Sequence, residues 1–133
     1  VFTRGVEAAK VKENIAKLAE KLARERQNTV VVTGKEDIVA SAGKIYIVKN
    51  GHELMGKFVG TGCMSASLLG CFAAVERKQD EASAAALACY GIAAELAAQK
   101  ASAPAAFKQQ LFDELYNLKP ATVKKMQKIE ELK

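Results

Sequence analysis

The stretch Val59-Gly60-Thr61-Gly62-Cys63-Met64-Ser65-Ala66-Ser67-Leu68-Leu69-Gly70 joins a glycine-rich turn to a run of small and apolar residues that predicts a buried helix. The glycines allow backbone N–H groups to turn toward one point. A helix that begins near Cys63 adds its own free N–H groups and the positive end of its dipole. We therefore expect an anion hole with Cys63 at its rim, suited to a phosphoryl group in transfer. A side chain in place of Gly62 should block a positive φ or crowd the phosphate.

Two well-known phosphate-binding motifs do not match this stretch. A Walker A loop places Gly-Lys-Ser/Thr after its first glycine and four further residues, whereas Lys57 precedes the glycines here. A dinucleotide-binding fingerprint requires a glycine where Ser65 stands. An ordinary glycine turn that caps a helix stays open as the simpler interpretation of Gly-Thr-Gly-Cys.

Length and composition indicate one globular domain at most. The chain has 133 residues, of which half are apolar, so it can bury a core and does not have the composition of a disordered chain. It contains no uncharged apolar run of about 18 residues and no signal peptide, so we expect no membrane segment. The first residue is Val1 rather than methionine, which hints at a piece of a longer protein.

The net charge of +5 comes from basic residues that are spread along predicted helices. Acidic residues are interleaved with them, as in the pair Glu13 and Lys17, which has the favourable order on a helix. Few aromatic residues lie nearby to stack on bases. We interpret these charges as solvated helix faces and expect no nucleic-acid partner.

The cysteine pattern indicates a reducing, cytoplasmic compartment. The three cysteines, Cys63, Cys71 and Cys89, match no zinc-binding spacing. On one helix Cys63 and Cys71 would lie about 12 Å apart along the axis, too far for a disulfide. Cys71 and Cys89 are expected to be small buried hydrophobic residues. His52, the single histidine, has no companion for a metal site and is expected in a loop or at the surface.

Periodicity predicts a helical and β-strand mixture. Residues 29–33 form a β-branched strand that should be buried on both faces, and Asn50-Gly51 indicates a tight turn. The first helix should carry an apolar stripe of Val11, Ile15, Leu18 and Leu22, whereas Asp80 and Ser102 should cap later helices. The expected strands are 29–33, 38–40 and 44–49, and the expected helices are 6–26, 63–75, 80–100, one that carries Phe107, Leu111, Leu115 and Leu118, and a last one over 121–132.

A strand as apolar as residues 29–33 needs sheet neighbours and helices on both faces. The chain offers a short hairpin beside it, followed by helices. We therefore expect residues 1–133 to be the C-terminal half of a larger α/β domain. The alternative is that the hairpin and the helices close a small α+β core by themselves.

Several segments, in the same order, resemble the hydroxyethylthiazole kinase family over nearly the whole chain. They are Val30-Val31-Val32-Thr33-Gly34, Asn50-Gly51-His52-Glu53-Leu54-Met55, Gly60-Thr61-Gly62-Cys63-Met64, Tyr90-Gly91-Ile92-Ala93-Ala94-Glu95 and Leu115-Tyr116-Asn117-Leu118. The resemblance implies a ribokinase-like fold, an α/β layered αβα sandwich, of which residues 1–133 would be the C-terminal half of a single kinase domain. It also implies a homotrimer with active sites between subunits.

The activity that the resemblance implies is phosphate transfer from ATP, with Mg²⁺, to the hydroxyl of hydroxyethylthiazole in thiamine biosynthesis or salvage. Cys63 matches the position of the proton acceptor, and it would accept the hydroxyl proton or hold the hydroxyl in place. The amides of residues 60–63, which include Thr61 and Gly62, match the anion hole. Thr33 matches a threonine that contacts the nucleotide phosphates, and Gly60 matches a glycine whose backbone touches the thiazole.

Other interpretations of these residues stay open. Thr33 could be a strand-end residue whose hydroxyl bonds its own backbone. The metal-associated Asn-x-x-Glu segment, a phosphate-binding arginine and the apolar wall around the thiazole match positions before this region, so no metal ligand is assigned here. Glu36 and Asp37 are polar and near the phosphate end, but their spacing does not make them ligands.

Two other functions compete with the thiazole kinase. Hydroxymethylpyrimidine kinase shares Gly-Thr-Gly-Cys, although residues 50–55 and Met64 favour the thiazole enzyme. The chain could instead be a non-catalytic half that serves only in assembly or regulation.

Overall fold

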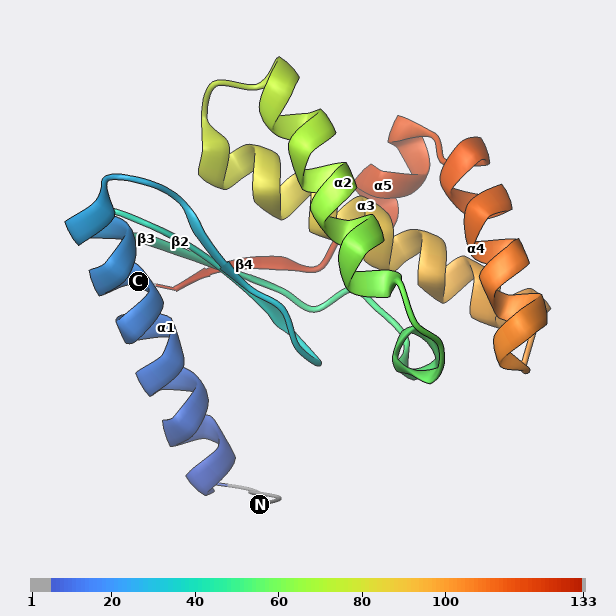
Figure 1. The fold of residues 1–133 in the computed structure, drawn as a ribbon, viewed down its shortest axis with the longest axis horizontal. Helices are drawn as coiled ribbons and strands as arrows, with labels where there is room; N and C mark the ends of the chain where they lie inside the picture. The colour runs from blue at the N-terminus through green and yellow to red at the C-terminus, as the bar shows by residue number, and fades with distance from the viewer. Residues whose placement is uncertain (1–5, 133) are drawn as a thin grey trace.

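A four-stranded antiparallel sheet lies between α1 on one face and the remaining helices on the other (Figure 1). The computed structural model describes residues 6–132. The elements are α1 (Val6–Arg26), β1 (Val30–Val32), β2 (Asp37–Ser41), β3 (Lys44–Val48), the 3₁₀ helix η1 (Glu53–Lys57), α2 (Thr61–Val75), α3 (Gln79–Lys100), α4 (Pro104–Asn117), α5 (Pro120–Met126) and β4 (Ile129–Leu132).

The alternation of side chains along β2 builds the layers. Ile38 and Ala40 pack in a buried cluster with Ala16 and Ala19 of α1. Val39, which points to the opposite face, packs in another cluster with residues of α3 that include Leu87. Both faces of the sheet are therefore covered by a helix, as expected for a layered αβα arrangement.

The apolar stripe of α1 does not face the sheet. The helix turns its alanines, Ala16, Ala19 and Ala23, toward the strands and buries them almost completely. The larger residues of the expected stripe remain exposed, and Leu18 is 66% exposed. The helix itself was predicted correctly, but the small alanine side chains let it approach the strands closely.

A second core lies away from the sheet, between α3, α4 and the segment before α2. Phe107 and Leu111 of α4 and Tyr90 of α3 are buried in it. Phe58, which precedes α2, packs on Phe107 with the rings 6.1 Å apart in an edge-on arrangement. This core holds the start of α2 against α3.

The expected C-terminal helix over residues 121–132 is wrong in its second half. α5 ends at Met126, and residues 129–132 form β4 on the outer edge of β3. Ile129 lies opposite Val48 and packs on the cluster beneath α3. The backbone N–H and C=O groups of β3 need hydrogen-bond partners along that edge. Pairing with β3 therefore outweighs the local helical pattern of residues 129–132.

Three burial predictions also need correction. β1 is only half-buried rather than buried on both faces, because it pairs with β2 alone among the described strands. Ser65 is the only buried residue of α2, so α2 is not the buried helix that its sequence predicts. Cys71 is exposed, and Cys89 is partly buried, which raises the pKa of its thiol.

Helix boundaries differ slightly from the predictions. α2 begins at Thr61 instead of Cys63. Lys78 and Ala103 occupy the N-cap positions of α3 and α4, instead of Asp80 and Ser102, and neither helix has a side-chain cap. Asp80 lies in the first turn of α3, where its charge still complements the helix dipole. None of the described helices has both the length and the apolar character needed to cross a membrane.

Candidate active site

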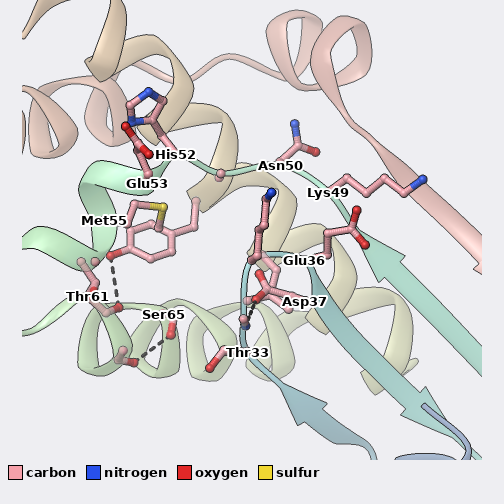
Figure 2. Close-up of a pocket in the computed structure, with 18 residues that line it drawn as sticks. Thr33, Glu36, Asp37, Lys49, Asn50, His52, Glu53, Met55, Thr61 and Ser65 are labelled. Carbon is pink, nitrogen blue, oxygen red and sulfur yellow. Dashed lines mark hydrogen bonds between the residues drawn. The ribbon is translucent and has the colours of Figure 1, made fainter. Parts of the chain in front are cut away.

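A cavity of about 740 Å³ opens where the β1–β2 loop, the segment after β3 and the start of α2 meet. Figure 2 shows Thr33 from the β1–β2 loop and Asp37 from the start of β2 on the side of the cavity next to α2, which contributes Thr61 and Ser65. Asn50, His52 and Met55 come from the segment after β3. The other lining residues are Gly34, Lys35, Glu36, Lys49, Gly51, Glu53, Gly56, Gly62, Leu87, Tyr90 and Gly91.

The N-terminus of α2 presents backbone donors to this cavity. The first helical hydrogen bond runs from the amide of Met64 to the carbonyl of Gly60, at 2.9 Å. The amides of the first turn therefore have no acceptor within the helix, and no side chain caps it. Because Thr61 and Gly62 line the cavity, this end of α2 can receive a phosphate group.

The glycine requirement lies at Gly60 rather than at Gly62. Gly60 is the N-cap of α2 and has φ +111°, in the region that favours glycine. Gly62 has no positive φ, and a Cβ built on it meets nothing within 4 Å. The expectation of a positive φ at Gly62 is therefore wrong, although Gly62 does line the cavity.

Tyr90 of α3 braces the start of α2. Its hydroxyl donates a hydrogen bond to the carbonyl of Thr61 at 3.1 Å, and burial raises the pKa of Tyr90 to about 12. The hydroxyl thus remains a donor across the physiological range. Ser65 adds a second brace from within α2, because its hydroxyl donates to the carbonyl of Gly62 at 2.8 Å.

The β1–β2 loop brings Thr33 and a shaped turn to the cavity. Thr33 follows β1 directly and is exposed in the lining. Asp37 accepts a hydrogen bond from the amide of Gly34 at 3.0 Å, which closes the turn. Burial raises the pKa of the Asp37 carboxyl, and the Gly34 hydrogen bond only partly opposes this. Glu36 is held by an ion pair with Lys12 of α1.

The structure thus gathers three of the residues that the sequence singles out. Thr33, Thr61 and Gly62 line one cavity. Gly60 and Cys63 flank Thr61 and Gly62 in the chain. Neither of these flanking residues lines the cavity, and Cys63 is exposed. No sequence pattern singles out Tyr90 or Asn50 as a site residue, although both lie in segments that carry the family resemblance.

Comparisons with known proteins point to one family. The chain matches the model of the hydroxyethylthiazole kinase family over residues 1–121. It is 50% identical over 129 residues to the hydroxyethylthiazole kinase of Methanosarcina acetivorans, with 97% of this chain and 49% of that protein aligned.

This chain belongs to the hydroxyethylthiazole kinase family.

Two further members extend the comparison. The hydroxyethylthiazole kinase of Methanosarcina mazei is 45% identical, with 98% of this chain and 50% of that protein aligned. The solved structure of the hydroxyethylthiazole kinase protein from Pyrococcus horikoshii OT3 superposes with a TM-score of 0.84 at 41% identity, over 92% of this chain and 48% of that one. The family and the α/β fold are therefore as predicted, and the chain spans about half the length of these relatives.

The described residues of this family member do not form a metal site by themselves. No group of three His, Cys, Asp or Glu side chains within residues 6–132 is arranged to hold a metal ion. In the cavity, one oxygen of Asp37 is already engaged with the amide of Gly34. We therefore assign no metal ligand among residues 6–132.

Proposed function

We propose that the protein containing this chain phosphorylates the hydroxyl of hydroxyethylthiazole with ATP, as a step of thiamine biosynthesis or salvage. The observation that carries the proposal is the uncapped start of α2, which opens at Thr61 and Gly62 into a cavity that Thr33 also lines. A donor-rich helix end beside a hydroxyl-bearing loop suits a nucleotide phosphate. Membership of the hydroxyethylthiazole kinase family supports the thiazole alcohol as the acceptor.

The proposed roles follow from what each group can donate. The amides of Thr61, Gly62 and Cys63 would stabilise negative charge on the transferring phosphoryl group, and Thr33 would donate its hydroxyl to the nucleotide phosphates. Such fixed donors usually contribute most to catalysis of this kind, because phosphoryl transfer depends mainly on positioning and electrostatic stabilisation. Tyr90 would keep the first turn of α2 in place through its hydrogen bond to Thr61.

Cys63 and Gly60 complete the proposed site from beside the cavity. Cys63 would accept the proton of the thiazole hydroxyl or hold that hydroxyl in line, and the backbone of Gly60 would contact the thiazole ring. Cys63 is the third residue of α2 and is exposed, so such a substrate can reach its thiol. Phosphoryl transfer through a loose transition state needs little help from a base. Cys63 could therefore position the hydroxyl from the same place without deprotonating it.

Magnesium belongs to the proposal as the ion that accompanies ATP and neutralises phosphate charge. The described residues offer no three-ligand cluster, so no step proposed above passes through the ion. We also propose a cytoplasmic homotrimer with active sites between subunits. The exposed apolar residues of α1 and α2, such as Leu18 and Val75, leave surface that further protein segments could cover.

The decisive experiment uses the full-length protein and two variants of one residue. If Cys63 acts on the hydroxyl, Cys63→Asp should remain active, because a carboxylate can accept or orient the same proton. Cys63→Ala should lose roughly 10²-fold or more in turnover. Rates are measured at saturating ATP with hydroxyethylthiazole, and with hydroxymethylpyrimidine as a competing substrate.

The control for Cys63 is the thermal stability of both variants. An inert cysteine predicts the opposite order, with alanine tolerated and an unpaired charge damaging. A folded Cys63→Ala protein that is faster than folded Cys63→Asp would remove Cys63 from the site. Preferred turnover of hydroxymethylpyrimidine would reassign the substrate.

A further inference from the structure

We infer that Asn50 and Glu95 are positioning residues whose hydrogen bonds hold residues 49–55, one wall of the cavity, against α3. This inference rests on the proposed function of the cavity. It concerns a polar network that links the exit of β3, the middle of α3 and the segment between α5 and β4.

The side chain of Asn50 is buried, and its polar atoms find hydrogen-bond partners both on α3 and on the segment that joins α5 to β4. The residue is only 4% exposed. Its amide nitrogen donates to Glu95 Oε1 and to the carbonyl of Met126, both at 3.0 Å. Its amide oxygen accepts from the backbone of Lys128 at 2.7 Å. Both N–H groups and the carbonyl of this amide are thus used, which fixes its orientation.

Glu95 connects this amide to the backbone of the cavity wall. Its Oε1 atom also accepts from the amide of Gly51 at 3.1 Å, and its carboxylate pairs with the Lys128 ammonium at 3.0 Å. Hydrogen bonds to an ionised group are the stronger kind. Glu95 therefore holds two consecutive residues of the wall against α3.

Close packing reinforces the same contact. A Cβ added to Gly91, one turn before Glu95, would lie 2.5 Å from the backbone carbon and oxygen of Asn50. The backbone of α3 therefore touches the wall directly at Gly91. Gly51, with φ +147°, then turns the chain toward η1, where the amides of Leu54 and Met55 bond back to His52.

Glu95 lies behind the wall, so its effect on the cavity is indirect. Asn50 lines the cavity together with Lys49, Gly51, His52 and Met55, and Glu95 does not. Removing the Glu95 carboxylate leaves one N–H of the Asn50 side chain and the backbone amide of Gly51 without their acceptor, and such unpaired groups favour rearrangement of the loop. The expected consequence is weaker substrate binding with a smaller effect on turnover.

The test compares Glu95→Ala with Glu114→Ala in the full-length protein. The side chain of Glu114 in α4 is 11% exposed, against 15% for Glu95. Its carboxylate accepts from Lys100 and Gln110 instead of from residues 49–55. Two readouts are used: hydrogen exchange of the amides of residues 51–55 without ligand, and KM and kcat for ATP and hydroxyethylthiazole.

We expect Glu95→Ala to speed exchange at residues 51–55 by about tenfold or more, since a hydrogen bond to a charged group is worth roughly that factor. The KM of at least one substrate should rise by a similar factor, with a smaller change in kcat. Glu95→Gln keeps an acceptor oxygen, so its exchange rates and KM should lie close to those of the parent. Glu114→Ala should lower thermal stability without changing exchange at residues 51–55 or KM.

Exchange and KM within twofold of the parent in folded Glu95→Ala would overturn the inference. If Glu95→Ala does not fold, Glu95→Asp, whose shorter side chain withdraws the acceptor from Asn50 and Gly51, is compared with Glu114→Asp. Exchange at residues 51–55 within twofold of each other in these two variants overturns the inference. A parent protein that does not phosphorylate hydroxyethylthiazole would refute the proposed function alone, because the exchange measurement still decides the role of Glu95.

Discussion

Replacement of Gly91 by alanine should destabilise the protein, although alanine is the better helix former. Gly91 lies in the middle of α3 and is fully buried. Its added Cβ would meet the backbone carbon and oxygen of Asn50 at 2.5 Å and the Cβ of Asn50 at 2.6 Å. Two of these three atoms belong to the backbone, so no side-chain rotation relieves the overlap, and α3 must separate from the loop.

The size of the effect follows from opposing contributions. Replacing a glycine inside a helix by alanine stabilises the helix by about 1 kcal/mol. Overpacking costs about 1–3 kcal/mol, and separating α3 from the loop weakens the hydrogen bonds of Asn50, each worth about 1 kcal/mol. We expect a net loss of about 2–4 kcal/mol, which corresponds to a fall in Tm of about 5–15 °C.

The assay is urea unfolding and thermal melting of the full-length protein, with Gly70→Ala as the matched control. Gly70 also lies inside a helix, α2, but a Cβ on it meets nothing within 4 Å. The control should therefore be neutral or stabilising. A Gly91→Ala protein as stable as its parent would refute the close contact between α3 and Asn50, and with it the rigid wall of the cavity.

Three further changes test individual contacts of the site. Gly60→Ala should lower unfolding stability by about 1–3 kcal/mol, because alanine is strained at φ +111°; an unchanged urea midpoint would contradict that conformation. Burial raises the pKa of the Asp37 carboxyl, so stability from this group is present at acid pH and is lost as the pH rises through its folded pKa. Asp37→Asn should accordingly melt higher than the parent at pH 7 and lose that advantage near about pH 3.5; a lower Tm at pH 7 speaks against the burial effect. Tyr90→Phe should cost about 0.5–1.5 kcal/mol through the lost bond to Thr61 and slow turnover, and full activity in the variant would show that this brace is dispensable.

Much of the fold follows from local patterns. The β-branched run that contains β1, the Asn50-Gly51 turn and the glycine-rich start of α2 were all recognisable, because the responsible groups are neighbours in the chain. The same is true of the uncapped start of α2, where we propose that phosphate binds, because it depends on backbone amides rather than on distant side chains. Family membership was also predictable, since the segments that carry the resemblance occur in order along the chain.

The walls of the cavity could not be predicted in the same way. The bonds from Tyr90 to Thr61 and from Asn50 to Glu95 join residues 29 and 45 positions apart. No local pattern encodes such a pairing, because it exists only once α3 has docked. The place of Asp37 in the sequence also does not reveal that it lines the cavity or that its carboxyl has a raised pKa, since burial is a property of the assembled fold.

The sequence by itself determined most of the helical and extended segments up to residue 126 and placed the free amides of α2 beside the glycine-rich turn, because these depend on propensity and on backbone geometry over a few residues. Tertiary structure decided that residues 129–132 become a strand, since the edge of β3 offers them hydrogen-bond partners that a helix does not use. It also decided that α1 buries its alanines instead of its larger apolar residues. In both cases the outcome depends on a surface that forms only when distant parts of the chain pack together.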